Sequence, residues 1–155
     1  MRTSDGGDHW EEVKTEAASW SLAAVCFRDL KNGWIVGFAG QILRSRDGGA
    51  TWTAVASPVK SWLTSITFDS AGRGWIAYDD GLLLSRDGGE TWKAVPIPGR
   101  YFLARLIRRS DSLWALGQSA ILRQTGAGMD WKKIESLAPG GSAAAIGRNA
   151  VLSTK

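Results

Sequence analysis

Residues 45–52 read Ser45-Arg46-Asp47-Gly48-Gly49-Ala50-Thr51-Trp52, and nearly the same octapeptide returns forty positions later as Ser85-Arg86-Asp87-Gly88-Gly89-Glu90-Thr91-Trp92. A third copy, Thr3 to Trp10, lies forty-two residues before the first of these. A degenerate fourth copy, Gln124 to Trp131, lies thirty-nine residues after the second. A sequence that repeats with a period of about forty residues predicts a repeat architecture.

The repeated unit extends beyond the octapeptide. Trp34, Trp75 and Trp114 each precede the tryptophan of their own copy by 17 or 18 residues, and we assign them to the core because they hold the same place in every unit. The clearest unit predicts strands over residues 63–68, 74–78, 82–85 and 91–95, with turn residues between them. A repeated unit of four strands and about forty residues is typical of a β-propeller blade.

We therefore predict an all-β fold, a β-propeller of about four four-stranded blades, forming a single partial domain over residues 1–155. The expected divisions are the end of a blade over 1–13, three blades over 22–55, 62–95 and 101–134, and the start of a blade over 142–155.

The octapeptide has the composition of a tight turn between two strands. Glycine adopts a positive φ without strain, an aspartate accepts hydrogen bonds from nearby N–H groups, and the tryptophan packs over the turn. In the degenerate copy Gly126 replaces the aspartate. We assign structural turn roles to Asp5, Gly7 and Trp10, to Ser45, Asp47, Gly49, Thr51 and Trp52, to Ser85, Asp87, Gly89, Thr91 and Trp92, and to Trp131.

Charge and composition narrow the classes of partner. The formal net charge is +4, and 12 of the 19 basic residues are arginines, which pair well with carboxylates. We expect an acidic partner surface and no nucleic acid, because the basic residues are scattered along the chain. No apolar stretch is long enough to span a membrane. Cys26 is the only cysteine, lies in an apolar run and is expected to be an inert, buried thiol.

Candidates for an enzyme site are few. Asp79 and Asp80 form an acidic pair that could serve a glycosidase, although a solvated turn is the plainer interpretation. His9 is the only histidine, so the sequence offers few of the side chains that a metal site or a catalytic triad requires. We expect no catalytic residues, no metal and no cofactor, and keep a sialidase-like or glucanase-like glycosidase as the alternative function.

A binding function has better candidates. Arg100, Arg105, Arg108 and Arg109 surround the predicted first strand of the third blade, which lines the channel of a propeller. We predict that they bind a protein partner through an acidic segment or a chain terminus. In the alternative interpretation these arginines pair with Asp69, Asp111 or solvent.

The pattern Ser-x-Asp-x-Gly-x-Thr-Trp resembles the Asp-box, or bacterial neuraminidase repeat, of sialidases, some glucanases, sortilin-type receptors and photosystem II assembly factors. Gly33–Gly37, Gly40–Ser45, Asp47–Gly49 and Thr51-Trp52 together resemble the photosystem II stability and assembly factor family. That resemblance implies a seven-bladed, non-enzymatic propeller in the thylakoid lumen or periplasm, or secreted, which binds photosystem reaction-centre subunits. The compartment is not encoded in this chain.

Seven blades of this period would need about 280 residues, so we expect the chain to be incomplete. Three outcomes remain open. The chain is a fragment of a larger propeller, an open arc that completes itself by association of its open blade edges, or a four-bladed ring closed by pairing its terminal strands.

Overall fold

The computed structural model describes residues 1–13, 15, 21–109, 112–125 and 130–136. Within them lie twelve strands. The first sheet contains β1 (Leu22–Phe27), β2 (Gly33–Gly37), β3 (Ile42–Ser45) and β4 (Thr53–Val55). The second contains β5 (Leu63–Phe68), β6 (Gly74–Tyr78), β7 (Gly81–Ser85) and β8 (Lys93–Val95). The third contains β9 (Leu103–Arg109), β10 (Ser112–Gly117), β11 (Ala120–Thr125) and β12 (Trp131–Ser136).

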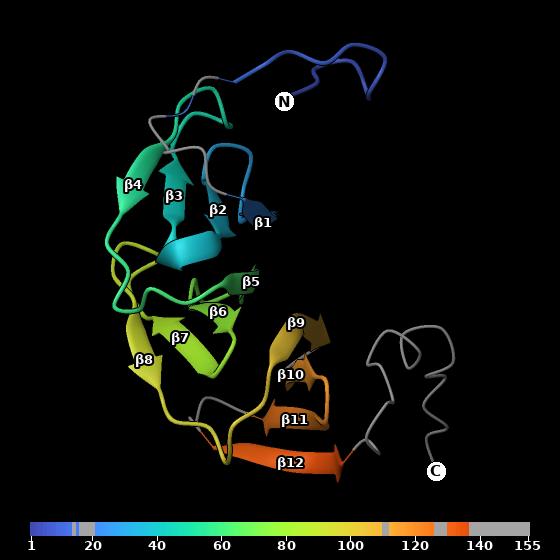
Figure 1. Ribbon diagram of the computed structural model, residues 1–155. Coiled ribbons are helices and arrows are strands. Elements are labelled where there is room, and N and C mark those ends of the chain that lie inside the picture. Colours follow the sequence, from blue (N-terminus) through green and yellow to red (C-terminus); the bar gives the residue numbers. More distant parts are fainter. Residues whose placement is uncertain (14, 16–20, 110–111, 126–129, 137–155) are drawn as a thin grey trace.

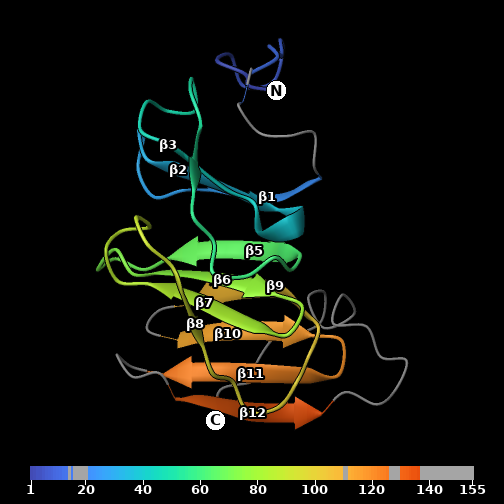
Figure 2. The same cartoon turned by 60° about the vertical axis from the view of Figure 1, so that its left-hand side comes forward.

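Each sheet is an antiparallel meander in which neighbours in sequence are neighbours in space. The three sheets follow one another along an arc, with β1, β5 and β9 on its inner side and β4, β8 and β12 on its outer side (Figure 1). Seen from the side, they stack as successive layers (Figure 2). The prediction of an all-β, blade-like architecture is confirmed, and a short 3-10 turn, Phe38–Gly40, is the one departure among the residues that the structure describes.

The last strand of the second sheet begins later than the sequence predicts, at Lys93 instead of Thr91. The cause is local. The backbone N–H and the hydroxyl of Thr91 both bond the carboxylate of Asp87, so Thr91 belongs to the turn and is not free to pair with β7.

Each inner strand carries a register shift near its start, between Leu22 and Ala24 in β1 and between Leu63 and Ser65 in β5. In β9 the equivalent irregularity leaves Ala104 and Arg105 both exposed. A bulge of this kind bends the strand and redirects its side chains. The inner strands β5 and β9 also bond directly, because Thr64 Oγ1 donates to the Leu103 carbonyl at 2.7 Å.

The hydrophobic core consists of two clusters, each between adjacent sheets. One joins the first and second sheets around Trp34, Ile76 and Leu83, and the other joins the second and third around Trp75, Leu82 and Leu122. Trp34 and Trp75 are buried as expected, with exposed fractions of 0% and 4%. Trp114, at the equivalent place in the third sheet, is only partly buried, and the guanidinium of Arg123 lies 4.9 Å from its ring.

Candidate partner-binding site

The Asp-box turn of the second sheet is a closed set of hydrogen bonds. Ser85 Oγ donates to Asp87 Oδ1 at 2.8 Å and accepts from the backbone N–H of Gly89 at 2.7 Å. Thr91 donates twice to the Asp87 carboxylate, from its backbone N–H at 3.0 Å and from its hydroxyl at 2.5 Å. Every polar group involved lies within four residues of its partner, so the octapeptide folds this turn by itself.

The same arrangement recurs in the other two boxes that the structure describes. Ser45, Asp47 and Thr51 repeat the contacts at 2.6 to 2.9 Å. In the N-terminal box, His9 stands in the place of the threonine, and its Nδ1 lies 2.6 Å from Asp5 Oδ2. The centre of the degenerate copy, 126–129, lies outside the described residues, as does the predicted partial blade 142–155, while Trp131 is buried at the start of β12.

Hydrogen bonding keeps the box carboxylates ionised. The Thr51 hydroxyl, followed by the Thr51 backbone N–H, lowers the pKa of Asp47 to about 2. The two equivalent groups of Thr91 lower the pKa of Asp87 to about 2. The Thr3 hydroxyl is the largest cause of a lowered pKa at Asp5. The oxygens of these carboxylates already accept hydrogen bonds within their own turns, which leaves them little capacity to act as acids or metal ligands.

One contact of the box crosses from sheet to sheet. Trp10 and Trp52 each donate their indole N–H to the glycine carbonyl of their own box, at 2.9 and 3.1 Å. In the second sheet the Gly89 carbonyl instead accepts from Trp34 of the first sheet, at 3.2 Å. Within the described part of the chain, Trp92 Nε1 then has no hydrogen-bond partner. The repeat spacing gives no sign of this exchange of donors.

A charged contact reinforces the same junction. Arg44 is buried on β3, lies 5.1 Å from the ring of Trp34, and ion-pairs with Glu90 in the box of the second sheet. Arg46 approaches the other oxygen of Glu90 at 3.0 Å. The hydrogen bond from Arg44 is the largest cause of the lowered pKa of Glu90. Sequence reasoning missed this trio, because Glu90 lies more than forty residues after both arginines.

A second charged contact joins the second and third sheets. Asp69, buried at the end of β5, accepts from Arg73 Nε at 2.6 Å and lies 3.8 Å from Arg108 Nη1 on β9. One buried carboxylate is thus shared by two guanidinium groups, one from each blade. The Asp69–Arg73 spacing across a short hairpin was a usable sequence signal for the first of these pairs.

The four predicted partner-binding arginines are spread along the third blade. Arg100 is exposed in the loop between β8 and β9, Arg105 is exposed near the start of β9, and Arg109 is exposed at its end. At about 3.3 Å per residue, Arg105 and Arg109 stand about 13 Å apart along the strand. Arg108 is partly engaged by Asp69, as one alternative interpretation anticipated, and Asp111 lies outside the described residues.

The enzyme candidates lie apart from these groups. Asp79 and Asp80 form the turn between β6 and β7, at the end of the sheet opposite the Asp-box. Burial, and secondarily the charges of Asp80 and Asp79, raise the pKa of Tyr78.

Burial also raises the pKa of the partly buried Cys26 thiol. Among the described residues, no group of three His, Cys, Asp or Glu side chains is placed to hold a metal ion. Nor does any helix there have the length and apolar character to cross a membrane.

This chain is similar to known proteins in family, sequence and fold. The family model described as photosynthesis system II assembly factor YCF48 matches residues 50–150. The photosystem II assembly lipoprotein Ycf48 of Synechocystis sp. is 29% identical over 84 residues, which are 52% of this chain and 25% of that protein. The chloroplastic photosystem II stability/assembly factor HCF136 of Arabidopsis thaliana is 28% identical over 77 residues, 48% of this chain and 19% of that protein.

These two matches therefore take in a quarter or less of each relative. Among solved structures, YCF48 bound to D1 peptide superposes with a TM-score of 0.71 at 23% identity, over 80% of this chain and 42% of that one. The GH74 enzyme of Niastella koreensis superposes with a TM-score of 0.61 at 20% identity, over 74% of this chain and 20% of that one. At these identities both structures share the fold and nothing finer.

Proposed function

The chain belongs to the photosynthesis system II assembly factor YCF48 family, and on that premise we propose that it is a non-enzymatic propeller scaffold that binds a protein partner during photosystem II assembly. The partner is a reaction-centre subunit or a protein like one, presenting an acidic segment or a free chain terminus. The names of the two relatives, a lipoprotein in one case and a chloroplastic factor in the other, support a site of action in the thylakoid lumen or periplasm.

One observation carries the proposal: the fold is shared with a YCF48 structure that holds a D1 peptide, and in this chain the inner strand β9 presents exposed arginines. Arg105 and Arg109 are exposed, while Arg108 is partly buried, with its Nη1 3.8 Å from Asp69 Oδ2. A carboxylate that reaches this strand would form charge-assisted hydrogen bonds with guanidinium groups. We therefore assign the partner contact to Arg105, Arg108 and Arg109, with Arg100 contributing from the preceding loop.

The test uses a fluorescent acidic peptide with a free C-terminal carboxylate, and its amidated form, titrated against the full chain across a salt series. Replacing Arg105, Arg108 and Arg109 by alanine is expected to weaken binding at least about tenfold and to flatten its salt dependence. The matched control replaces Arg86, Lys93 and Lys132, three exposed basic residues away from β9, and removes the same total charge.

Equal losses in the two triple variants would show that only net charge matters and would refute the assigned site. Binding that is indifferent to salt would refute the electrostatic mechanism. Because Arg108 contacts the buried Asp69, melting curves of each variant establish that the fold is retained before the affinities are compared.

A further inference from the structure

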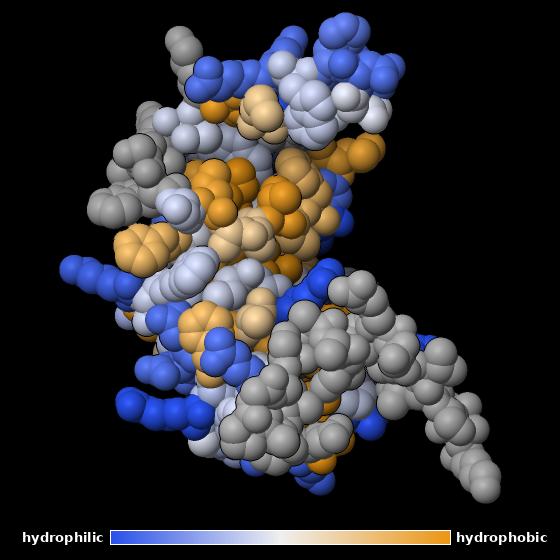
Figure 3. Space-filling view, turned by 45° about the vertical axis from the view of Figure 1, so that its right-hand side comes forward, coloured by the Kyte–Doolittle hydropathy of each residue, from blue (hydrophilic) through white to orange (hydrophobic). Residues whose placement is uncertain are grey.

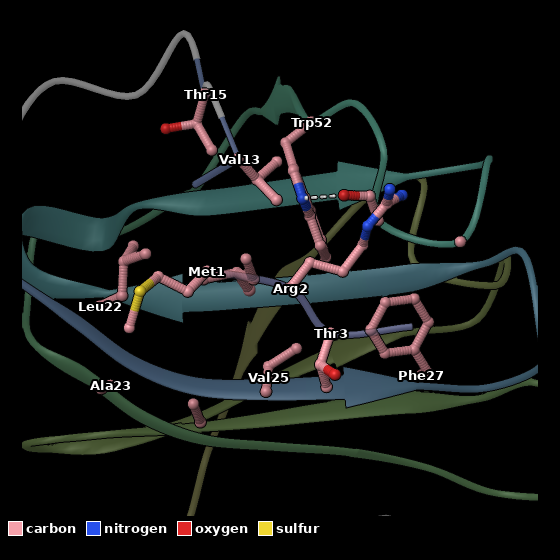
Figure 4. A pocket seen from close by; sticks show the side chains of 14 residues that line it. Met1, Arg2, Thr3, Val13, Thr15, Leu22, Ala23, Val25, Phe27 and Trp52 are labelled. Carbon is pink, nitrogen blue, oxygen red and sulfur yellow. Dashed lines mark hydrogen bonds between the residues drawn. The ribbon is translucent and has the colours of Figure 1, made fainter. Parts of the chain in front are cut away.

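Trp62 is a tryptophan that the repeat does not explain. Seven of the nine tryptophans hold one of the two recurring places of the repeat, but Trp62 holds neither, and Trp20 lies outside the described residues. The indole N–H of Trp52 donates to the Gly49 carbonyl of its own box, as the dashed line in Figure 4 shows. Within the part of the chain that the structure describes, the indole N–H of Trp62 has no such partner, and the residue is 45% exposed. The fold therefore uses neither the polar atom of this side chain nor the whole of its ring.

The same feature returns in the next blade. Phe102 lies forty residues after Trp62 and is 37% exposed. Each of the two rings comes directly before the fully buried leucine that begins an inner strand, β5 or β9. Each also follows, by two residues, an exposed cation, which is Lys60 in one blade and Arg100 in the next. Because the positions are equivalent and a hydrogen bond joins the starts of β5 and β9, the two ring–cation pairs lie at the same level of neighbouring blades.

Phe38 brings a third exposed ring to this end of the sheets. It opens the 3-10 turn between β2 and β3 and is 46% exposed. The N–H of Gly40, in the same turn, donates to the carbonyl of Ser61, the residue before Trp62, at 2.8 Å. We call Phe38, Trp62 and Phe102 the aromatic end, and it lies opposite the Asp-boxes. Figure 3 shows hydrophobic surface at the height of the first two sheets, with hydrophilic side chains projecting beside it.

The aromatic end lies where strands begin and turn, not on the face of a sheet. In a stack of blades, neighbours pack against the faces, as both core clusters do here, so this surface stays exposed however many blades adjoin the three. Nor do its rings line either of two cavities, one of about 670 Å³ against β1 (Figure 4) and one of about 370 Å³ beside the box of the second sheet. The rings are therefore presented outward, at one level.

Aromatic side chains at one level, each beside a cation, suit the headgroup region of a lipid bilayer. A tryptophan combines an apolar body with a polar N–H and favours the boundary between lipid and water. A lysine or an arginine lays its stem along apolar surface and keeps its charge in the polar layer. We propose that the aromatic end docks on a bilayer surface, where its three rings enter the headgroup boundary and Lys60 and Arg100 contact lipid phosphates.

The other charges at this end determine which lipids are preferred. Asp79 and Asp80 form the turn between β6 and β7 at the same end, and Asp80 is exposed. Their negative charges offset the positive charges of Lys60 and Arg100, so the attraction to anionic lipid is weak. Burial of the rings then supplies most of the binding. We expect binding to neutral phosphatidylcholine vesicles, with a gain of less than about tenfold when phosphatidylglycerol is added.

The test measures co-sedimentation of the full chain with vesicles of phosphatidylcholine alone, or of phosphatidylcholine with about a quarter of phosphatidylglycerol. One variant combines Trp62→Ser with Phe102→Ser, and a second, Trp62→Phe, keeps a ring. The control is Leu30→Ser, because Leu30 is 95% exposed in the turn between β1 and β2, at the opposite end of the sheets. Arg100 stays unchanged throughout, since the proposed peptide contact also uses it.

We expect the double serine variant to bind vesicles at least about tenfold more weakly than the wild type, while Leu30→Ser and Trp62→Phe stay within about threefold of it. Brominated phosphatidylcholine should quench part of the wild-type fluorescence. That part should disappear in Trp62→Phe, because Trp62 is the tryptophan that enters the bilayer. Melting curves establish that each variant is folded, as is expected for substitutions at exposed positions.

The proposal is overturned if the wild type binds neither kind of vesicle, or if the double serine variant binds as well as Leu30→Ser does. Equal quenching of the wild type and Trp62→Phe would overturn it too. If the wild type binds no vesicles and the double variant loses the acidic peptide, the surface belongs to a protein partner instead. The peptide titration at β9 depends on other variants, so the two proposals fail separately.

Discussion

Gly89 combines two requirements that only glycine meets. Its φ is +85°, a region that costs other residues about 1 to 2 kcal/mol, and an added Cβ would lie 2.5 Å from Trp34 Nε1. Gly6, the first glycine of the N-terminal box, has a similar φ of +80°, but a Cβ there would meet nothing within 4 Å. Comparing alanine substitutions at Gly89 and Gly6 therefore separates the cost of backbone strain from the cost of overpacking.

We predict that Gly89→Ala lowers the free energy of unfolding by about 2 to 4 kcal/mol, since overpacking adds to the strain. Gly6→Ala should cost about 1 to 2 kcal/mol at most, because backbone strain is its only penalty and the N-terminal hairpin lies outside the packed sheets. Urea unfolding of the two variants measures the difference. Equal losses would mean that the Trp34 contact with this turn contributes nothing to stability.

The box carboxylates make the protein sensitive to acid. Their pKa in the folded chain, about 2 for Asp47 and Asp87, lies below the ordinary value of 3.8. A depressed pKa contributes stability that is fully present above the unfolded-state value and is lost as the pH falls toward the folded-state value. The melting temperature should therefore drop between about pH 4 and pH 2.

Asp47→Asn combined with Asp87→Asn is the matched variant, since asparagine keeps the shape but does not titrate. Its melting temperature should be lower than that of the wild type at neutral pH, and the drop in acid should be shallower. A drop of the same steepness in both proteins would assign the acid sensitivity to other carboxylates.

At the scale of elements, the junction between the first two sheets depends on Glu90. Its carboxylate holds Arg44, whose side chain is 7% exposed, and Arg46, whose side chain is 60% exposed. Removing Glu90 leaves a buried guanidinium without its counter-charge, which is more costly than losing a surface pair. Glu90 is itself half exposed, so water recovers part of the loss.

We predict that Glu90→Ala lowers the free energy of unfolding by about 1 to 2 kcal/mol and that added salt does not restore it. Glu11→Ala is the control, because Glu11 meets Arg2 at 3.6 Å with both side chains well exposed, and its loss should cost less than about 0.5 kcal/mol. Chemical denaturation of both variants at two salt concentrations tests this. A Glu90→Ala variant as stable as Glu11→Ala would contradict a structural role for the buried pair.

Over the described residues, the three sheets form an array in which each packs against the next. Its cores lie between sheets, and the inner strands are tied by Thr64 to Leu103 and by Leu106 to Ser65, the latter at 3.1 Å. In such an array the stability is a sum of units and junctions, so the face of a terminal blade is chemically equivalent to an internal junction.

The sequence by itself determined the repeat period, the strands and the Asp-box turns. These features are local: Ser85, Asp87, Gly89 and Thr91 bond one another across at most four residues, so the octapeptide encodes its own conformation. The strand boundary at Lys93 was missed by two residues, because the turn and the strand compete for Thr91.

Only the tertiary structure decided which partners meet across the blades. Trp34 bonds a carbonyl 55 residues away, Arg46 meets Glu90 across 44 residues, and Arg108 meets Asp69 on the neighbouring inner strand. Because the unit is repeated, every blade carries similar donors and acceptors, and the sequence does not indicate which of them pair across blades. The choice follows from how one twisted sheet packs against the next, and that packing is a property of the assembled array.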